Sequence, residues 1–312
     1  MGATLSLMGQ VFPPASKFSV NDIPDLTGRV IIVTGANTGL GKETAKALLV
    51  HNAKVYIAAR SKDKAEQAIQ DLKQETGKQA HFLKLDLADL KSVKAAAEEF
   101  HSKETQLHIL FNNGGVMVPP VKDVTAQGYD LQFGTNVLGH FYFTKLLLPT
   151  LLATAKTSPD GTARVVSTAS SAEVFLSTID FNSLKDGPAR RNKYSSTLYA
   201  QSKFGNVVLS NELARRYGSE GLVSTAINPG NLQSDLQRHL SFFEWLFIRP
   251  ILYPTPFGAL NQLYAGTTAP GKEVNGKYVV PWARVIETSA PTKDPKIGQE
   301  LWKWMEEQVE NV

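Results

Sequence analysis

The chain of 312 residues contains no cysteine. This absence excludes disulfide bonds, thiolate-bound zinc, iron–sulfur clusters and a thiol nucleophile, and it fits a reducing compartment. An excess of one charge is also missing, because 33 Lys and Arg against 29 Asp and Glu leave a net charge of +4. The basic residues form no stripe with interleaved aromatics, so we expect a solvated, slightly basic surface and no nucleic-acid partner.

Long hydrophobic runs are absent as well. No stretch reaches the roughly 18 to 20 uninterrupted apolar residues that span a bilayer, so we expect no transmembrane segment. The beginning of the sequence lacks the shape of a secretory signal, and we predict a cytoplasmic protein. Gly2 and Ser6 match a myristoylation pattern. This match leaves open a lipid-anchored protein at a membrane surface, with an ordinary flexible tail as the alternative.

Internal repeats, low-complexity tracts and dividing linkers are not found either. With 42% hydrophobic residues, a chain of this length can bury a large core. Residues 1–27 are predicted to be an arm that precedes the fold. Behind it, short apolar runs at 29–34, 54–59, 80–85, 107–111, 164–168 and 222–227 alternate with helix-like segments at 40–49, 62–76, 90–100, 137–152 and 198–217.

This alternation indicates βαβ crossovers and a parallel sheet that is buried on both faces. We therefore predict an α/β fold in which residues 28–312 form one doubly wound parallel sheet with helices on both faces. An amphipathic helix is predicted over 298–309, packed on the body of the domain.

A glycine-rich turn directly follows the first predicted strand, and a helix-like segment begins at once behind it. Glycines allow the backbone to approach a diphosphate, whose charge is favoured at the positive end of a helix. The turn therefore predicts a nucleotide site. Its residues are Gly35, Asn37, Thr38, Gly39, Leu40 and Gly41.

The second predicted strand ends at Arg60. NAD-binding βαβ units usually have an acidic residue in this place, which accepts hydrogen bonds from the ribose. A guanidinium instead matches a 2′-phosphate in geometry and charge. Arg60 therefore favours NADP(H) as the cofactor, with a surface arginine at a helix entry as the alternative interpretation.

Two motifs together resemble the short-chain dehydrogenase/reductase family: the Gly-x-x-x-Gly-x-Gly spacing of the turn and the segment from Tyr199 to Lys203, Tyr-Ala-Gln-Ser-Lys. The resemblance extends in order from Gly35 to Gly230 and covers the C-terminal third only loosely. Twenty-nine positions separate Ser170 from Tyr199, and this long spacing resembles the branch of retinol dehydrogenases and WW-domain oxidoreductases. The family implies a Rossmann fold and a nicotinamide dinucleotide.

The resemblance also implies further cofactor contacts. Asp86 and Leu87, after the third strand, correspond to a pair that contacts adenine. Asn113 and Gly114 lie in Asn-Asn-Gly-Gly, which resembles the family's Asn-Asn-Ala-Gly beneath the cofactor; we expect the glycine to loosen this turn. The positions that match the nicotinamide end of the family's site are Pro229, Gly230, Leu232 and Ser234.

Four residues correspond to the family's catalytic set: Asn136, Ser170, Tyr199 and Lys203. Ser171 is the alternative to Ser170. Tyr199 and Lys203 are four apart on a predicted helix, so their side chains share one face. The pKa of a free tyrosine is about 10, and we expect the nearby ammonium and the positive nicotinamide to lower it. The resemblance makes Tyr199 the proton donor, Ser170 a hydrogen-bond donor to the substrate oxygen, Lys203 a ribose ligand and Asn136 the holder of a water.

The substrate side is predicted to be apolar. Residues 231–256, which the resemblance implies cover the substrate, are rich in bulky apolar side chains, including Phe242, Trp245 and Phe247. Such walls would suit a hydrophobic ketone, aldehyde or alcohol. A subunit or membrane-surface contact and plain core are the alternatives, and a homo-oligomer stays open. The six histidines show no metal-ligand spacing, so we predict no metal.

We therefore predict an NADP(H)-dependent oxidoreductase that interconverts a carbonyl and an alcohol on a hydrophobic substrate, with Tyr199 as general acid/base. One alternative is an NAD(H)-dependent dehydrogenase of the same family. The other is a redox sensor that binds dinucleotide without turnover, which would not need the full set of Asn136, Ser170, Tyr199 and Lys203.

Overall fold

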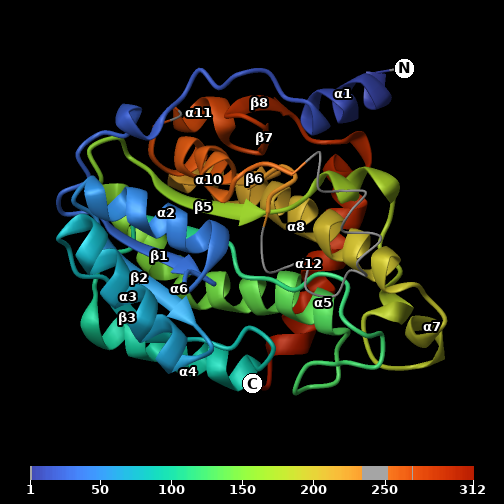
Figure 1. Ribbon diagram of the computed structural model, residues 1–312. Helices are drawn as coiled ribbons and strands as arrows, with labels where there is room; N and C mark the ends of the chain where they lie inside the picture. Colours follow the sequence, from blue (N-terminus) through green and yellow to red (C-terminus); the bar gives the residue numbers. More distant parts are fainter. Residues whose placement is uncertain (1, 234–251, 269) are drawn as a thin grey trace.

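The computed structural model describes residues 2–233, 252–268 and 270–312. Its strands form one eight-stranded sheet in the order β3-β2-β1-β4-β5-β6-β7-β8. Seven of them are parallel, and the first six follow the predicted runs: β1 (Val30–Thr34), β2 (Lys54–Ala59), β3 (His81–Lys84), β4 (Ile109–Asn112), β5 (Ala163–Thr168) and β6 (Leu222–Ile227). The prediction of a doubly wound α/β fold is confirmed (Figure 1).

The helices cover both faces of the sheet (Figure 1). Alternate residues of β1 point to opposite sides, as a strand requires. Ile31 and Val33 join the core under α2 (Gly39–Val50), α3 (Lys62–Thr76) and α10 (Thr255–Leu263). Val30 and Ile32 join the core on the other face. The helices there are α4 (Leu90–Lys103), α6 (Gly139–Thr157), α8 (Ser195–Tyr217) and α12 (Pro295–Val309).

Two strands extend the sheet beyond the predicted six. β7 (Lys277–Val280) pairs parallel to β6, and β8 (Arg284–Glu287) returns antiparallel to β7. The predicted C-terminal helix is confirmed as α12, which buries Leu301, Trp302 and Met305 against the body.

The first 27 residues do not form a separate arm, so this prediction is corrected. They begin with α1 (Gly2–Val11). Phe18, Ile23 and Leu26 are buried in the core beneath α2. Since these three side chains exchange water for apolar contacts, the second half of the segment belongs to the domain.

The helix predicted over 137–152 begins earlier. Asp130 accepts hydrogen bonds from the backbone N–H groups of Gln132 and Phe133 and so caps α5 (Leu131–Phe133). A single π-helical turn, Gly134–Leu138, then leads into α6. By length and composition, the helical stretch Leu131–Thr157 could cross a membrane, but 67% of its most apolar window is buried inside the fold. Its buried apolar side chains are part of the core that Val30 and Ile32 join.

Candidate active site

The glycine turn lies between β1 and α2, at the carboxyl edge of the sheet where the strand order reverses from β1 to β4. Gly35 has φ +66°, and a Cβ there would lie 2.7 Å from the Cα of Gly114. A Cβ on Gly41 would lie 2.6 Å from Nδ2 of Asn113. The backbone therefore comes closer to its neighbours than any side chain permits, and Gly39 opens the helix with φ +53° and free space around it. This turn fits a diphosphate at the N-terminus of α2.

Thr34 connects this turn to the end of β4. Its hydroxyl oxygen accepts hydrogen bonds from the backbone N–H groups of Asn113 (2.9 Å) and Gly114 (2.8 Å). Asn113 in turn donates from Nδ2 to the carbonyl oxygen of Thr34, at 2.8 Å. Nε2 of Gln262, on α10, donates to Oδ1 of Asn113 at 3.2 Å. The glycine at position 114 therefore lies in a tightly bonded turn, contrary to the expected loosening.

The residues predicted for the adenosine end lie along the same edge. Arg60 is exposed directly after β2, and Lys84 Nζ donates to its carbonyl oxygen. Oδ1 of Asp86 accepts from the backbone N–H of Ala88 at 3.0 Å. Leu87 is buried against Gly114. Two cations thus flank the position where an adenosine ribose is expected.

Helix α8 brings Tyr199 and Lys203 to the end of β5. Lys203 Nζ lies 5.6 Å from the centre of the Tyr199 ring and donates to the carbonyl oxygen of Thr168 at 2.9 Å. Ser170 follows β5 and hydrogen-bonds the Tyr199 hydroxyl through its side chain. The structure thus brings together Ser170, Tyr199 and Lys203, and it is Ser170 rather than Ser171 that contacts the tyrosine.

Burial dominates the acid–base properties of this group. It raises the pKa of Tyr199 to about 12, although the hydrogen bond from Ser170 opposes the rise. It also lowers the pKa of Lys203 to about 8. The expected fall of the Tyr199 pKa is therefore wrong for the chain by itself, because loss of solvation outweighs the hydrogen bond from Ser170.

Asn136 lies in the π-helical turn and is fully buried. Its side-chain amide forms a pair of hydrogen bonds with the backbone of Val116: Oδ1 accepts from the N–H at 2.9 Å, and Nδ2 donates to the carbonyl at 3.0 Å. Nδ2 also donates to Oγ of Ser202, the neighbour of Lys203, at 2.9 Å. With the side chain engaged in this way, the main-chain carbonyl of Asn136 is the group left for other partners.

The imidazole of His140 is hydrogen-bonded to that carbonyl. Its Nδ1 lies 3.0 Å from the oxygen of Asn136, and its Nε2 lies 2.9 Å from Oγ1 of Thr34. The Asn136 oxygen can only accept a hydrogen bond. The Thr34 hydroxyl oxygen already accepts from two backbone N–H groups, and its proton is shared between this ring and the carbonyl oxygen of Phe111 at 3.2 Å. Nε2 is therefore the acceptor and Nδ1 carries the hydrogen. Burial lowers the pKa of His140 to about 4, which agrees with this neutral form.

The turn after β6 forms the last side of the site. Gly230 has φ +83°, and a Cβ there would lie 3.0 Å from the Trp282 ring. Pro229 is half-buried, and Leu232 is buried and pairs with Tyr253 in a short parallel bridge. Ser234 and most of the predicted covering segment, including Phe242, Trp245 and Phe247, lie outside the described residues. The end of that segment, at 255 and 256, belongs to α10.

The long connection between Ser170 and Tyr199 is held by one buried arginine. Arg190 is fully buried and donates from Nη2 to Asp186 at 2.7 Å and from Nη1 to Asp130 at 3.4 Å. Asp130 caps α5, the helix that leads to Asn136. At the two ends of the connection, Phe175 (71%) and Tyr194 (82%) are strongly exposed.

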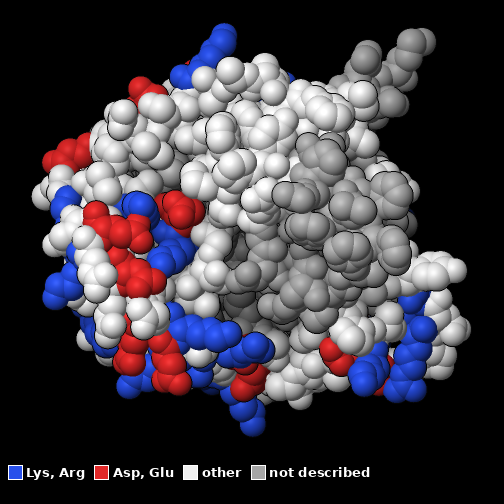
Figure 2. Space-filling view, in the orientation of Figure 1, with Lys and Arg blue, Asp and Glu red and all other residues white. Residues whose placement is uncertain are grey.

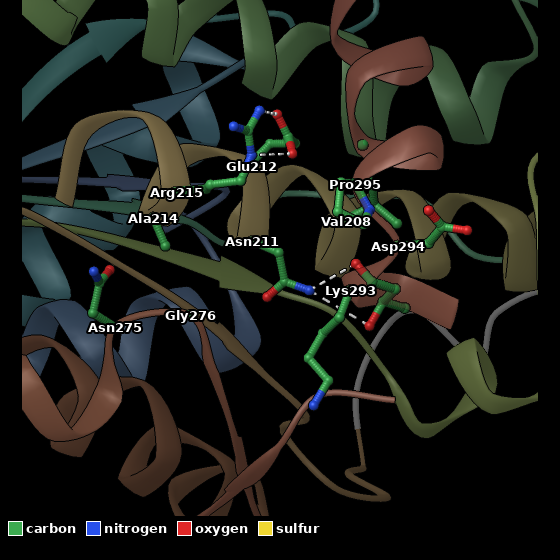
Figure 3. A pocket seen from close by; sticks show the side chains of 12 residues that line it. Val208, Asn211, Glu212, Ala214, Arg215, Asn275, Gly276, Lys293, Asp294 and Pro295 are labelled. Carbon is green, nitrogen blue, oxygen red and sulfur yellow. Dashed lines mark hydrogen bonds and ion pairs between the residues drawn. The ribbon is translucent and has the colours of Figure 1, made fainter. Parts of the chain in front are cut away.

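Other surface features lie apart from this site. A hollow between α8 and α12 is lined by Asn211, Glu212 and Arg215 together with residues 292–295 (Figure 3). None of the predicted site residues lines it. On the face shown in Figure 2, charges of both signs are interspersed along the left and lower parts, and the upper part is largely uncharged.

Three contributing residues were not predicted from the sequence. His140 lies four positions after Asn136, so helical spacing could have placed both on one face. Gln262 lies in the C-terminal third, where the resemblance to the family is loose, and no local sequence pattern marks it. Asn206 donates to the carbonyl of Thr168 at 3.1 Å beside Lys203, one helical turn further along α8.

Known proteins are similar to this chain in sequence and in fold. The family described as short chain dehydrogenase matches residues 29–178. The chain is 58% identical over 311 residues to a short-chain dehydrogenase/reductase of Armillaria gallica, covering 100% of both chains. A crystal structure of an uncharacterised protein from Mycobacterium paratuberculosis superposes with TM-score 0.74 at 30% identity, covering 95% of this chain and 98% of that one.

A solved complex of Pseudomonas aeruginosa RhlG with NADP gives TM-score 0.64 at 26% identity, covering 82% of this chain and 95% of that one. These names do not specify a branch, so the resemblance to retinol dehydrogenases stays a prediction. The fold, the edge at which the site residues meet and these relatives lead to one assignment: the chain belongs to the short-chain dehydrogenase/reductase family of oxidoreductases.

Proposed function

We propose that this oxidoreductase uses NADP(H) to interconvert a carbonyl and an alcohol on a hydrophobic substrate, with Tyr199 as the general acid/base. The observation that carries the proposal is the group formed by the half-buried Ser170 and Tyr199 and the buried Lys203 at the carboxyl edge of the sheet, beside a glycine turn suited to a diphosphate. The choice of NADP(H) is supported by RhlG, a protein of similar fold that is solved in complex with NADP.

The residues present fit the dinucleotide. The turn from Gly35 to Gly41 would hold the diphosphate, since a Cβ at either end would fill the space that a close backbone approach needs. The exposed guanidinium of Arg60 would bind a 2′-phosphate by charge-assisted hydrogen bonds. Lys203 would bind the nicotinamide ribose, and Pro229 and Gly230 would border the nicotinamide. When bound, the dinucleotide supplies or accepts the hydride.

The chain's own residues perform the proton chemistry. A Tyr199 with a pKa near 12 is a neutral phenol at pH 7, which is the form that donates a proton to a carbonyl oxygen. Ser170 can donate its hydroxyl hydrogen to the same oxygen and so orient it. Asn136 and His140 keep the surrounding π-helical turn in place. In this form Tyr199 is ready to donate a proton in the reduction, whereas oxidation of the alcohol requires that it first lose this proton.

A hydrophobic substrate is supported by exposed aromatic side chains on the connection between Ser170 and Tyr199. Phe175 and Tyr194, each five positions along the chain from one of these two residues, are strongly exposed. Exposed apolar side chains favour contacts with an apolar ligand.

The proposal is tested by following the oxidation of NADPH and NADH by the purified protein with a panel of ketones and aldehydes. We expect turnover with NADPH and higher kcat/KM for larger apolar carbonyls. Arg60→Leu should lower kcat/KM for NADPH by about tenfold or more, because a hydrogen bond to a charged group is worth about 1.5–3 kcal/mol. The same substitution should leave NADH rates unchanged.

The matched control is Lys62→Leu, which removes an exposed cation two positions further on. It should leave the preference for NADPH intact. Equal or better rates with NADH in the unmodified protein would contradict the role given to Arg60 and favour the NAD(H) alternative. Dinucleotide binding without turnover of any carbonyl would favour the sensor alternative.

A further inference from the structure

The turn that follows β6 is oriented by the side-chain amide of Asn228. This amide accepts a hydrogen bond from the backbone N–H of Gly230 through Oδ1, at 3.0 Å. Its Nδ2 donates to Oε1 of Gln10, at 2.7 Å. An amide that must present its oxygen to one partner and its NH2 to another can adopt only one of its two flipped orientations. The N–H of Gly230 requires the Asn228 oxygen, and Gln10 supplies the acceptor that this orientation requires for Nδ2.

The side chain of Gln10 is buried, as is that of Asn228 in the turn. It is 5% exposed and Asn228 is 3% exposed, so the hydrogen bond between them is shielded from water. A buried amide that loses its partner pays the full cost of desolvation. Without Gln10, the Nδ2 donor of Asn228 would lack an acceptor. Rotation of the side chain toward another acceptor would then become favourable, and it would move Oδ1 away from Gly230.

A second hydrogen bond, from Arg284, holds the end of helix α1 next to this contact. The guanidinium of Arg284, at the start of β8, donates from Nη2 to the carbonyl oxygen of Gly9 and from Nε to that of Pro281, both at 2.6 Å. Pro281 precedes Trp282, whose ring packs against Gly230. The end of α1 is thus connected to the turn directly through Gln10 and indirectly through Arg284.

We propose that Gln10 is a positioning residue of the active site, which acts through Asn228 to fix the Pro229–Gly230 turn and with it the border of the nicotinamide pocket. The segment that carries it lies before the matched family region, which begins at residue 29. The proposal rests on the proposed function for its kinetic consequences. It also has a structural consequence, the protection of the Gly230 amide, that requires neither cofactor nor turnover.

The test compares Gln10→Met, which keeps the length of the side chain and removes the acceptor, with Gln10→Glu, which keeps an acceptor oxygen. Gln299→Met, on an exposed face of α12, is the matched control. Hydrogen exchange of the Gly230 amide in the cofactor-free protein should be about tenfold faster in Gln10→Met, as expected for the loss of about 1.4 kcal/mol of local stability. It should be restored toward the normal rate in Gln10→Glu and unchanged in the control.

The kinetic readout is the isotope effect on kcat with NADPH deuterated at the transferred position. If Gln10 positions the turn, hydride transfer slows in Gln10→Met, kcat falls about tenfold and the isotope effect rises, while the dissociation constant of NADPH changes less than threefold because the adenosine end is untouched. Loss of folded protein alone would lower the rate and leave the isotope effect as it was.

The outcomes separate the two proposals. Unchanged exchange at Gly230 in Gln10→Met overturns the positioning role, whatever the activity. Faster exchange together with an unchanged isotope effect overturns the link to hydride transfer. If the unmodified protein turns over no carbonyl while the Gly230 amide responds as expected, the proposed function fails and the contact between Gln10 and the turn stands.

Discussion

Nδ1 of His140 lies 3.0 Å from the main-chain oxygen of Asn136, while Nε2 of the same ring lies 2.9 Å from the hydroxyl of Thr34. One imidazole thus joins the helix that carries a predicted catalytic residue to the strand end that supports the glycine turn. His140→Phe would leave two buried polar groups without this partner. We expect the free energy of unfolding to fall by about 1–3 kcal/mol, since the Asn136 carbonyl loses its imidazole partner, whereas the Thr34 hydroxyl keeps the Phe111 carbonyl oxygen at 3.2 Å. Urea denaturation measures it.

The matched control for this substitution is His101→Phe, at an exposed position on α4. It should change the free energy of unfolding by less than about 0.5 kcal/mol. A His140→Phe protein as stable as the original would show that the two hydrogen bonds contribute nothing.

The same histidine predicts a pH dependence of stability. Burial lowers its pKa from 6.5 to about 4, so between these values the unfolded chain binds a proton that the folded chain does not. The free energy of unfolding therefore falls as the pH drops through this window, by about 3 kcal/mol for this group. The contribution is fully present above pH 6.5. Denaturation of the original protein and of His140→Gln at pH 7 and pH 4.5 should show a smaller fall in the variant; parallel curves would contradict the shift.

Tyr199→Phe removes the proposed proton donor and keeps the ring. We expect kcat to fall by about 10²–10⁴-fold, the range that general acid–base catalysis supplies. Binding of NADPH, followed by its fluorescence, should persist because the glycine turn and Arg60 are unchanged. A variant that retains substantial turnover would mean that another group is the acid.

Much of the fold follows from local sequence pattern. The bounds of β2 and α3, Lys54–Ala59 and Lys62–Thr76, coincide with those predicted, because a buried run and a charged helical segment are each recognisable alone. β7 and β8 were not predicted. Each has four residues, and β8 is only partly buried, so their order comes from pairing with β6 and with each other. Order that comes from pairing with a neighbouring strand cannot be recognised from the sequence of either segment alone.

The candidate site divides in the same way. Gly35, Tyr199 and Lys203 were placed by short spacings, which local geometry preserves. Gln262 contacts Asn113 across 149 positions, and no spacing indicates such a contact. The pKa of Tyr199 was mistaken for a similar reason: the sequence places a cation near the phenol, but the burial that raises the pKa exists only in the folded chain.

The glycine turn predicts a contrast between two alanine substitutions. A Cβ on Gly41 would lie 2.6 Å from Asn113 Nδ2 and 2.7 Å from the carbonyl oxygen of Gly35, so the turn must shift. We expect Gly41→Ala to lower the free energy of unfolding by about 1–3 kcal/mol and to weaken NADPH binding. Gly187→Ala meets nothing within 4 Å of its Cβ and should leave both quantities unchanged. Normal cofactor affinity in Gly41→Ala would refute the close approach.

Two neighbouring arginines that share one carboxylate differ in burial and in their further partners. Arg190 and Arg191 both bind Asp186, at 2.7 and 2.6 Å, and together they hold the pKa of that carboxyl well below its usual range. The Arg190 side chain is 1% exposed and also reaches the buried Asp130, whereas Arg191 is 64% exposed. Removing the buried partner strands Asp130 inside the protein, which costs about 3–5 kcal/mol.

We therefore expect Arg190→Met to lower the free energy of unfolding by about 3–5 kcal/mol and Arg191→Met by less than about 1 kcal/mol, because an exposed ion pair is weak and screened. Added salt should reduce only the Arg191 effect. Arg190→Met should also reduce kcat per folded molecule, since Asp130 caps the helix that leads to Asn136. Equal stability losses in the two variants would show that Asp186, the partner they share, and not the buried Asp130, accounts for what Arg190 contributes.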